Sequence, residues 1–220
     1  MEKDKVKLIK DPNIREAMRK AATRAATAAI QNGASYEEVL VAAEAIRSAG
    51  IMEHPLVMNM KVGWNQGEVF NTLYLAHGGQ FFKPGTAEVS INNEQGVAAL
   101  KLMKALSEYA NPDYLTQASN ETQGLWEAGK AALGIMWGSR GKAILDNEGS
   151  TTEITSNTTL SSAPTVAGGS TPAATLWWDG ISIAKNISDE DAEASFAALA
   201  SAMTSDMVEA HNDEAVWLVD

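Results

Sequence analysis

The sequence predicts an α/β fold in which helices outnumber strands. Short apolar runs at 56–60 and 131–136 are typical of buried strands, and segments with helical spacing of apolar residues lie between and around them. No tandem repeat of fixed length recurs along the chain. Strands that alternate with helices are the pattern of α/β proteins. We therefore expect a helix-rich lobe built around a small central sheet.

Two helices are predicted before the first strand. Asp11-Pro12 supplies an N-cap and a proline suited to the first helical position, and the Ala-rich stretch 12–32 stops at Asn32-Gly33. Ser35–Glu38 has the spacing of a capping box, and an apolar helical stripe follows it as far as Gly50.

A helix and a tight turn are predicted after the first strand. Apolar residues surround one face of 65–77, and Gly78-Gly79 ends that helix. The apolar stretches 81–82 and 89–91 then flank a turn at Lys83–Gly85.

A long helix is predicted over about 94–109. Asn92 or Asn93 supplies its N-cap, and Pro112 breaks the pattern beyond it. Its apolar positions recur with helical spacing, so we expect the inward face to carry Val97, Leu100, Met103 and Leu106.

The next part of the chain predicts helix, strand and helix in succession. A helix over about 119–129 precedes the strand at 131–136, and Trp137–Arg140 opens a further helix. Residues 147–173 are poor in large apolar side chains and rich in Ser, Thr and Gly, so we expect mostly loop there, with one extended piece near 158–163.

Two adjacent tryptophans mark the start of the C-terminal part. They end the apolar run Thr175–Gly180, and 181–184 follows as a predicted short strand. Neighbours on a strand point to opposite faces, so both indoles cannot enter the same core. Ser188–Asp191 caps a long helix that extends to about residue 204, and we expect 206–220 to be partly helical.

Charge and composition exclude several classes of protein. The net charge of −11 argues against a general nucleic-acid binder, although residues 1–24 hold eight Lys and Arg against four acids. The absence of cysteine excludes disulfides, thiolate catalysis and Cys-based zinc sites. No run approaches the roughly 20 apolar residues of a membrane span, and no signal peptide is visible after Met1. We expect the chain as given to be cytoplasmic unless an export signal precedes it.

No catalytic constellation emerges from the sequence. The three histidines are scattered, and none has the i, i+4 spacing of a helical zinc site. Ser139 is not in a G-x-S-x-G elbow, and Gly141-Lys142-Ala143 lacks the upstream Gly and the Ser or Thr of a P-loop. Glycoside hydrolysis would need a pair of carboxylates in a cleft, and nothing nominates such a pair. We therefore predict a protein without enzymatic activity, metal site or cofactor.

Tryptophan placement is the most informative feature of the chain. Trp64 precedes a predicted helix, Trp137 follows a predicted strand, and Trp177 and Trp178 end another. Binding sites commonly combine apolar walls with a few placed polar groups. Indole faces suit the apolar C–H face of a sugar ring, and core or hinge packing is the alternative role for Trp64 and Trp137.

Several stretches carry a resemblance to a known family. Their order and spacing from about Ser35 to Asp220 resemble the family-1, maltose-binding-like solute-binding proteins of carbohydrate ABC importers, which are type II periplasmic binding proteins. The matching stretches are Ser35–Gly50, Trp64 with Phe70–Phe82, Asn92–Ala105, Trp126–Arg140, Thr175–Asn186, Asp189–Ser205 and Asn212–Leu218. The resemblance does not extend to residues 1–34, so we expect a basic N-terminal extension (1–34) and a lobe (35–220).

The resemblance implies a function, a site and partners. Such proteins are non-catalytic, bind a mono- or oligosaccharide between two lobes, dock on the membrane permease of an ABC transporter, and are periplasmic or extracellular. The resemblance implies that stacking and hydrogen-bonding residues line the cleft: Trp64, Glu68, Asn71, Trp137, Arg140, Trp177, Trp178 and Asp179.

The resemblance also leaves an alternative function. Members of the family are about twice as long and have two lobes, whereas this chain corresponds mainly to one. An isolated or engineered lobe without ligand affinity would act only as a folded scaffold. An exposed aromatic cleft could then cause the lobe to self-associate as a homodimer.

Overall fold

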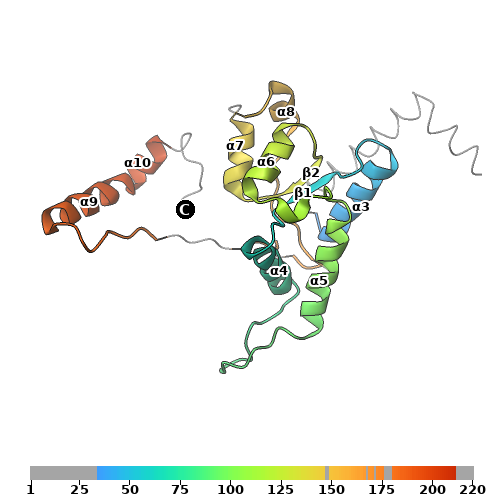
Figure 1. Cartoon of the computed structure of the whole chain (residues 1–220), viewed down its shortest axis with the longest axis horizontal. Helices are drawn as coiled ribbons and strands as arrows, with labels where there is room; N and C mark the ends of the chain where they lie inside the picture. The colour runs from blue at the N-terminus through green and yellow to red at the C-terminus, as the bar shows by residue number, and fades with distance from the viewer. Residues whose placement is uncertain (1–33, 147–148, 167, 171, 176–179, 212–220) are drawn as a thin grey trace, which may run out of the picture. The chain divides into compact units, whose positions relative to one another are not determined.

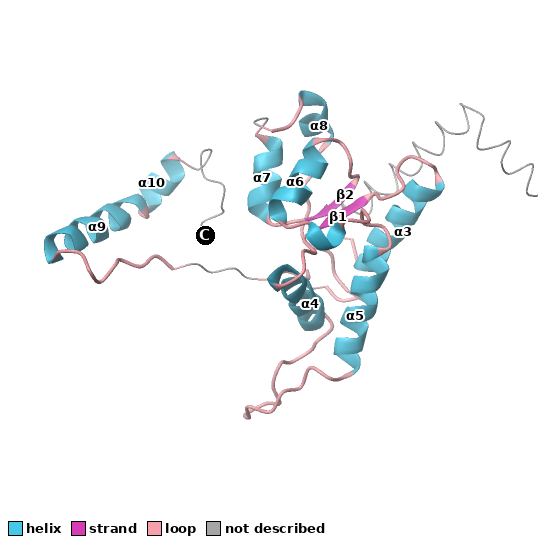
Figure 2. Ribbon diagram, viewed as in Figure 1, coloured by secondary structure: helices cyan, strands magenta, loops and turns pink. Residues whose placement is uncertain are grey.

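The computed structural model describes residues 34–146, 149–166, 168–170, 172–175 and 180–211 (Figures 1 and 2). The chain divides into two compact units, Met1–Thr175 and Leu176–Asp220. Helices predominate in both, and the first unit also contains a small parallel sheet, which confirms the predicted α/β class. The helix predicted over 12–32 lies outside the described residues.

The first described helix, α3 (Tyr36–Ser48), begins as predicted. The Ser35 side chain accepts the Glu38 N–H at 3.2 Å, and the Glu38 carboxylate accepts the Ser35 N–H at 2.8 Å, so the capping box is complete. Its apolar stripe is buried in the core and consists of Tyr36, Val39, Ala42, Ala43 and Ile46.

The sheet joins two parallel strands, β1 (Leu56–Met58) and β2 (Leu133–Ile135). Leu56 pairs with Leu133 and Met58 with Ile135. Both strands fall inside the predicted apolar runs but are shorter than those runs. All three residues of β1 are buried, as expected for a strand covered on both faces.

Helices α4 (Trp64–Ala76) and α5 (Glu94–Ser107) pack against each other, with a turn between them. Gly78, at φ 80°, follows the end of α4. The predicted turn is confirmed, because Phe82 and Val89 form an antiparallel bridge and the Lys83 N–H donates to the Glu88 carbonyl at 2.9 Å.

The face of α5 that enters the core differs from the prediction. Its buried residues are Gly96, Ala99, Leu102 and Leu106, of which only Leu106 was expected. Val97 is 48% exposed and Leu100 57% exposed, so the prediction that they point inward is wrong. Small residues occupy the inner positions because the chain approaches closely there: a Cβ added at Gly96 would lie 2.3 Å from the Ile91 carbonyl oxygen.

Helices α6 (Ser119–Glu127) and α7 (Gly138–Leu145) lie side by side near the sheet (Figure 1). A buried hydrogen bond fixes α6 to the segment that follows β1: the Thr122 hydroxyl donates to Asn59 Oδ1 at 2.9 Å. Both side chains are buried, and buried polar groups are normally paired in this way.

The segment 147–173 is more ordered than the sequence suggests. A short helix, α8 (Thr152–Asn157), begins at Thr151, whose hydroxyl accepts the Ile154 N–H at 3.3 Å. Outside α8, the described residues of this segment form no other helix, so the prediction of mostly loop is confirmed and α8 is the element that was not predicted. Thr158 has an extended backbone, as expected, but 158–163 pairs in no strand, and the bridge in this segment is instead the parallel one between Thr165 and Ser35.

The second unit contains helices α9 (Asp189–Ala202) and α10 (Ser205–Ala210). Ser188 caps α9 by accepting the Asp191 N–H at 3.1 Å, as its sequence predicts. Residues 181–184 form no strand, so that prediction is wrong. Within the described part of this unit, no residue of either helix is buried.

Candidate functional site

Two of the predicted site tryptophans meet in the structure. The indole rings of Trp64 and Trp137 stack with their centroids 5.5 Å apart and an interplanar angle of 26°. Trp64 is 56% exposed and Trp137 is partly buried. The pair therefore forms an aromatic wall, of which Trp64 is the more exposed member.

Parallel pairing of the strands explains why these residues meet. Trp64 follows β1 and is the first residue of α4, while Trp137 follows β2 and is the N-cap of α7. The carboxyl ends of parallel strands open on the same edge of a sheet, which is where α/β proteins bind ligands. Gly63 directs the chain into α4 with φ 115°, a conformation that side-chain-bearing residues rarely adopt.

Glu68 joins the aromatic wall one turn into α4. The indole Nε1–H of Trp137 donates a hydrogen bond to Glu68 Oε1 at 2.7 Å. The other oxygen, Oε2, is buried and has no hydrogen-bond partner among the described residues. Burial raises the pKa of the Glu68 carboxyl above its usual value, and the hydrogen bond from Trp137 acts in the opposite direction.

Arg140 points to a different helix. Its Nη1 donates to Gln123 Oε1 at 3.2 Å, and Gln123 Nε2 donates in turn to Glu127 Oε1 at 2.8 Å. This chain of hydrogen bonds links α7 to α6. Arg140 Nε is buried without a partner in the described part of the chain, so the guanidinium keeps one donor uncommitted.

Asn71 takes no part in these contacts. Asn71 is exposed and makes no hydrogen bond to any described residue. Trp177, Trp178 and Asp179 lie outside the described residues. The last described residue before them is Thr175, and its hydroxyl hydrogen-bonds to that of Thr72, one turn beyond Glu68 on α4.

Two polar residues near this wall could not be predicted from the sequence. Asn65 is only 3% exposed, and its Nδ2 has no partner within the described ranges. The other residue is Gln123, whose Oε1 accepts the hydrogen bond from Arg140 Nη1. Neither has a sequence signal that would have found it, because an isolated amide on a helix is ordinary and only the packing makes it notable.

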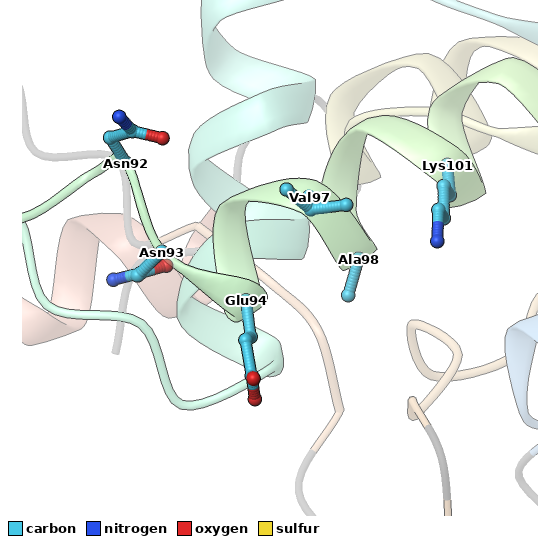
Figure 3. A pocket seen from close by; sticks show the side chains of 6 residues that line it. All are labelled: Asn92, Asn93, Glu94, Val97, Ala98 and Lys101. Carbon is cyan, nitrogen blue, oxygen red and sulfur yellow. The ribbon is translucent and has the colours of Figure 1, made fainter.

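A hollow of about 490 Å³ lies elsewhere, at the start of α5 (Figure 3). Glu94, Ala98 and Lys101 point to one side of the helix there, and Asn92 points away from it. No aromatic side chain lines this hollow. Its chemistry is that of an ordinary surface depression, so the aromatic wall is the better candidate site.

The described residues offer neither a metal-binding cluster nor a membrane-spanning helix. No cluster of three or more His, Asp or Glu side chains there could hold a metal ion. None of the described helices combines the length and apolar character needed to cross a bilayer.

Comparison with known proteins identifies the class of protein. The family model for bacterial extracellular solute-binding proteins matches residues 3–209. The chain therefore belongs to this family, whose members bind small solutes and are not enzymes. No curated protein matches the sequence.

Proposed function

We propose that this chain binds a carbohydrate as the substrate-binding component of an ABC sugar importer. The observation that supports this most directly is the stacked pair Trp64–Trp137 with Glu68 hydrogen-bonded beside it. Flat aromatic faces suit the C–H face of a sugar ring, and a carboxylate accepts hydrogen bonds from hydroxyls. Its partners would be a mono- or oligosaccharide and the permease subunits, and its place of action periplasmic or extracellular.

The proposed site extends beyond the residues that the structure brings together. Arg140 would supply its uncommitted Nε–H to a solute oxygen, and Asn71 would contribute an amide from the exposed side of α4. The proposed site also includes Trp177, Trp178 and Asp179, which the resemblance of the sequence to the family assigns to it.

We also propose that residues 35–220 act as one lobe of a two-lobed receptor, with the solute held between lobes. Ligand pockets bury most of the surface of a small ligand. Trp64 is 56% exposed. An aromatic wall of this kind covers only one side of a sugar, so a second wall is expected on the other side of the sugar.

Isothermal titration against a panel of neutral saccharides tests the carbohydrate function. Trp64→Ala should weaken binding of the best saccharide by about tenfold, the loss of one aromatic contact of about 1.4 kcal/mol. Phe82→Ala is a matched control, because Phe82 is a similarly exposed aromatic residue (54%) on the turn between α4 and α5. No saccharide binding, or equal effects of both substitutions, would contradict the proposal.

Size-exclusion chromatography with light scattering tests the alternative of a self-associating scaffold. A monomer at micromolar concentration is expected if the aromatic wall serves a solute. A homodimer that Trp64→Ala dissociates, together with no saccharide binding, would favour the scaffold instead.

A further inference from the structure

The Glu68 carboxylate is only half satisfied by the protein. One oxygen accepts the Trp137 indole N–H at 2.7 Å, and the other is buried with no partner among the described residues. An ionised carboxylate has about four acceptor positions and no donor. Buried polar atoms without a partner are rare in native proteins, so each one calls for an explanation.

Among the described residues, no neighbouring group donates a hydrogen bond to the second carboxylate oxygen of Glu68. The ion pairs found in the described part of the chain, Arg47–Glu44 and Lys83–Glu88, do not involve it. Arg140 donates to Gln123 on α6. Asn65 lies on the same side of α4, three residues earlier, yet its Nδ2 forms no hydrogen bond to Glu68.

We infer that Glu68 determines the specificity of the solute site. Its Oε2 accepts a hydrogen bond from an O–H or N–H of the solute, so the solute is a neutral or amino sugar and not a uronic acid or sugar phosphate. This inference rests on the proposed carbohydrate function and names the chemistry of the group that the site selects.

The local charge favours this selection. A solute carboxylate placed against Glu68 would bring two negative groups together at a partly buried position, which is repulsive. A hydroxyl or an ammonium group would instead satisfy the buried oxygen. Burial also raises the pKa of Glu68, as expected for a carboxylate that lacks a cationic partner.

Glu68 also acts as a positioning residue for the aromatic wall. The hydrogen bond from Trp137 fixes the rotation of that indole, and Trp64 stacks on the same ring. One carboxylate therefore orients the stacking surface and offers an acceptor beside it. A sugar ring needs both kinds of contact, one for its C–H face and one for its hydroxyls.

Titration calorimetry with saccharides of different charge tests the inference on the full chain. The probes are D-glucose, D-glucosamine and D-glucuronate, with maltose, chitobiose and digalacturonate as size-matched disaccharides. Wild-type protein should bind the neutral or amino member of a set at least about 100-fold more tightly than its acidic member. Glu68→Gln should weaken the neutral sugar about tenfold and reduce discrimination against the acidic sugar by at least as much.

Two further variants separate specificity from folding and from net charge. Glu37→Gln removes the same charge from an exposed site on α3 and should leave every affinity unchanged. Glu68→Asp keeps the charge but withdraws the oxygens by one methylene, so it should weaken the neutral sugar and retain the discrimination. Far-UV circular dichroism confirms that each variant is folded.

The possible outcomes distinguish this inference from the function on which it rests. If wild-type protein binds a saccharide but Glu68→Gln leaves both affinity and discrimination unchanged, or if the acidic probe binds best, the role of Glu68 is overturned and the carbohydrate function stands. If none of the six probes binds the wild-type protein, the carbohydrate function is overturned and the inference falls with it.

Discussion

Tyr74 should be the most consequential polar side chain for the stability of the first unit. It is fully buried on α4, between the rings of Phe70 and Phe81 at centroid distances of 5.6 and 5.3 Å. Its hydroxyl lies 2.8 Å from the Gln80 carbonyl and 3.0 Å from the Ser90 carbonyl, and donates to one of them at a time.

The same hydroxyl accepts a third hydrogen bond. Asn93 Nδ2 donates to Tyr74 Oη at 2.9 Å, and Asn93 is also the N-cap of α5, where its Oδ1 accepts the Gly96 N–H at 2.9 Å. The hydroxyl of Tyr74 thus joins α4, the turn that follows it and the start of α5.

Tyr74→Phe keeps the ring packing and removes one donated and one accepted hydrogen bond. At about 1 kcal/mol for each bond, the free energy of unfolding should fall by about 2 kcal/mol. For a unit of this size, that corresponds to a decrease in melting temperature of roughly 4–8 °C. Urea denaturation followed by circular dichroism measures the first quantity, and thermal denaturation the second.

Tyr114→Phe is the control for Tyr74→Phe. The Tyr114 side chain is partly exposed and its hydroxyl makes no hydrogen bond to the described residues, so the change should stay within about 0.5 kcal/mol. Asn93→Ala, alone and combined with Tyr74→Phe, completes a double-mutant cycle with an expected coupling of about 1 kcal/mol. A loss below 0.5 kcal/mol for Tyr74→Phe, or additive effects in the cycle, would refute the reasoning.

Three further changes test other contacts. Folding raises the pKa of the Glu68 carboxyl, so the folded state keeps this proton to higher pH than the unfolded state does. As the pH rises above 4.5, the usual pKa of a glutamate, the wild type should therefore lose stability relative to Glu68→Gln. Urea melts at pH 4 and pH 7 measure this, and a difference independent of pH would contradict it. Ser35→Ala removes the N-cap of α3 and should cost about 1 kcal/mol in thermal melts, whereas an unchanged melting temperature would show that the cap contributes nothing. Gly79→Ala places a Cβ 2.3 Å from the buried Tyr74 ring and should lower the free energy of unfolding by about 2 kcal/mol. Gly67→Ala is its control, because open space surrounds Gly67, and it should be neutral or stabilising. The reverse order of stabilities would show that the contact with Tyr74 is unimportant.

Elements with local signals could be predicted from the sequence. The capping box at Ser35–Glu38 and the N-caps Asn93 and Ser188 involve hydrogen bonds within three residues along the chain, so the sequence contains all their partners. The helix α8 was missed because its residues are mostly Thr, Ser and Asn, which have low helix propensity, and its cap at Thr151 is weak evidence by itself.

The buried face of α5 shows where a pattern of hydrophobicity fails. Two stripes with helical spacing exist on this helix, one through Val97 and Leu100 and one through Gly96 and Ala99. Hydrophobicity favours the first stripe. The second is buried because the small residues let the chain that enters the helix and the neighbouring helix approach, a steric requirement that hydropathy does not measure.

The candidate site could be predicted in part for a different reason. Trp64 and Trp137 are 73 residues apart, but each follows a predicted strand, and parallel pairing brings the carboxyl ends of those strands to one edge. The hydrogen bond between Trp137 and Glu68 could not be predicted, because it depends on the rotation of two side chains that contact each other only in the folded unit. Sequence position therefore identifies residues that can line such an edge, and packing decides which of them act together.

The exposure of Trp64 in the aromatic wall has a consequence for affinity. If the proposed function holds, stacking on Trp64 and a hydrogen bond to Glu68 would contribute a few kcal/mol, against the cost of restraining the sugar. Affinities of about 1 μM require roughly 8 kcal/mol, more than one wall can provide. The wall described here should therefore bind sugars more weakly by itself than together with a second surface, which should increase the affinity by orders of magnitude.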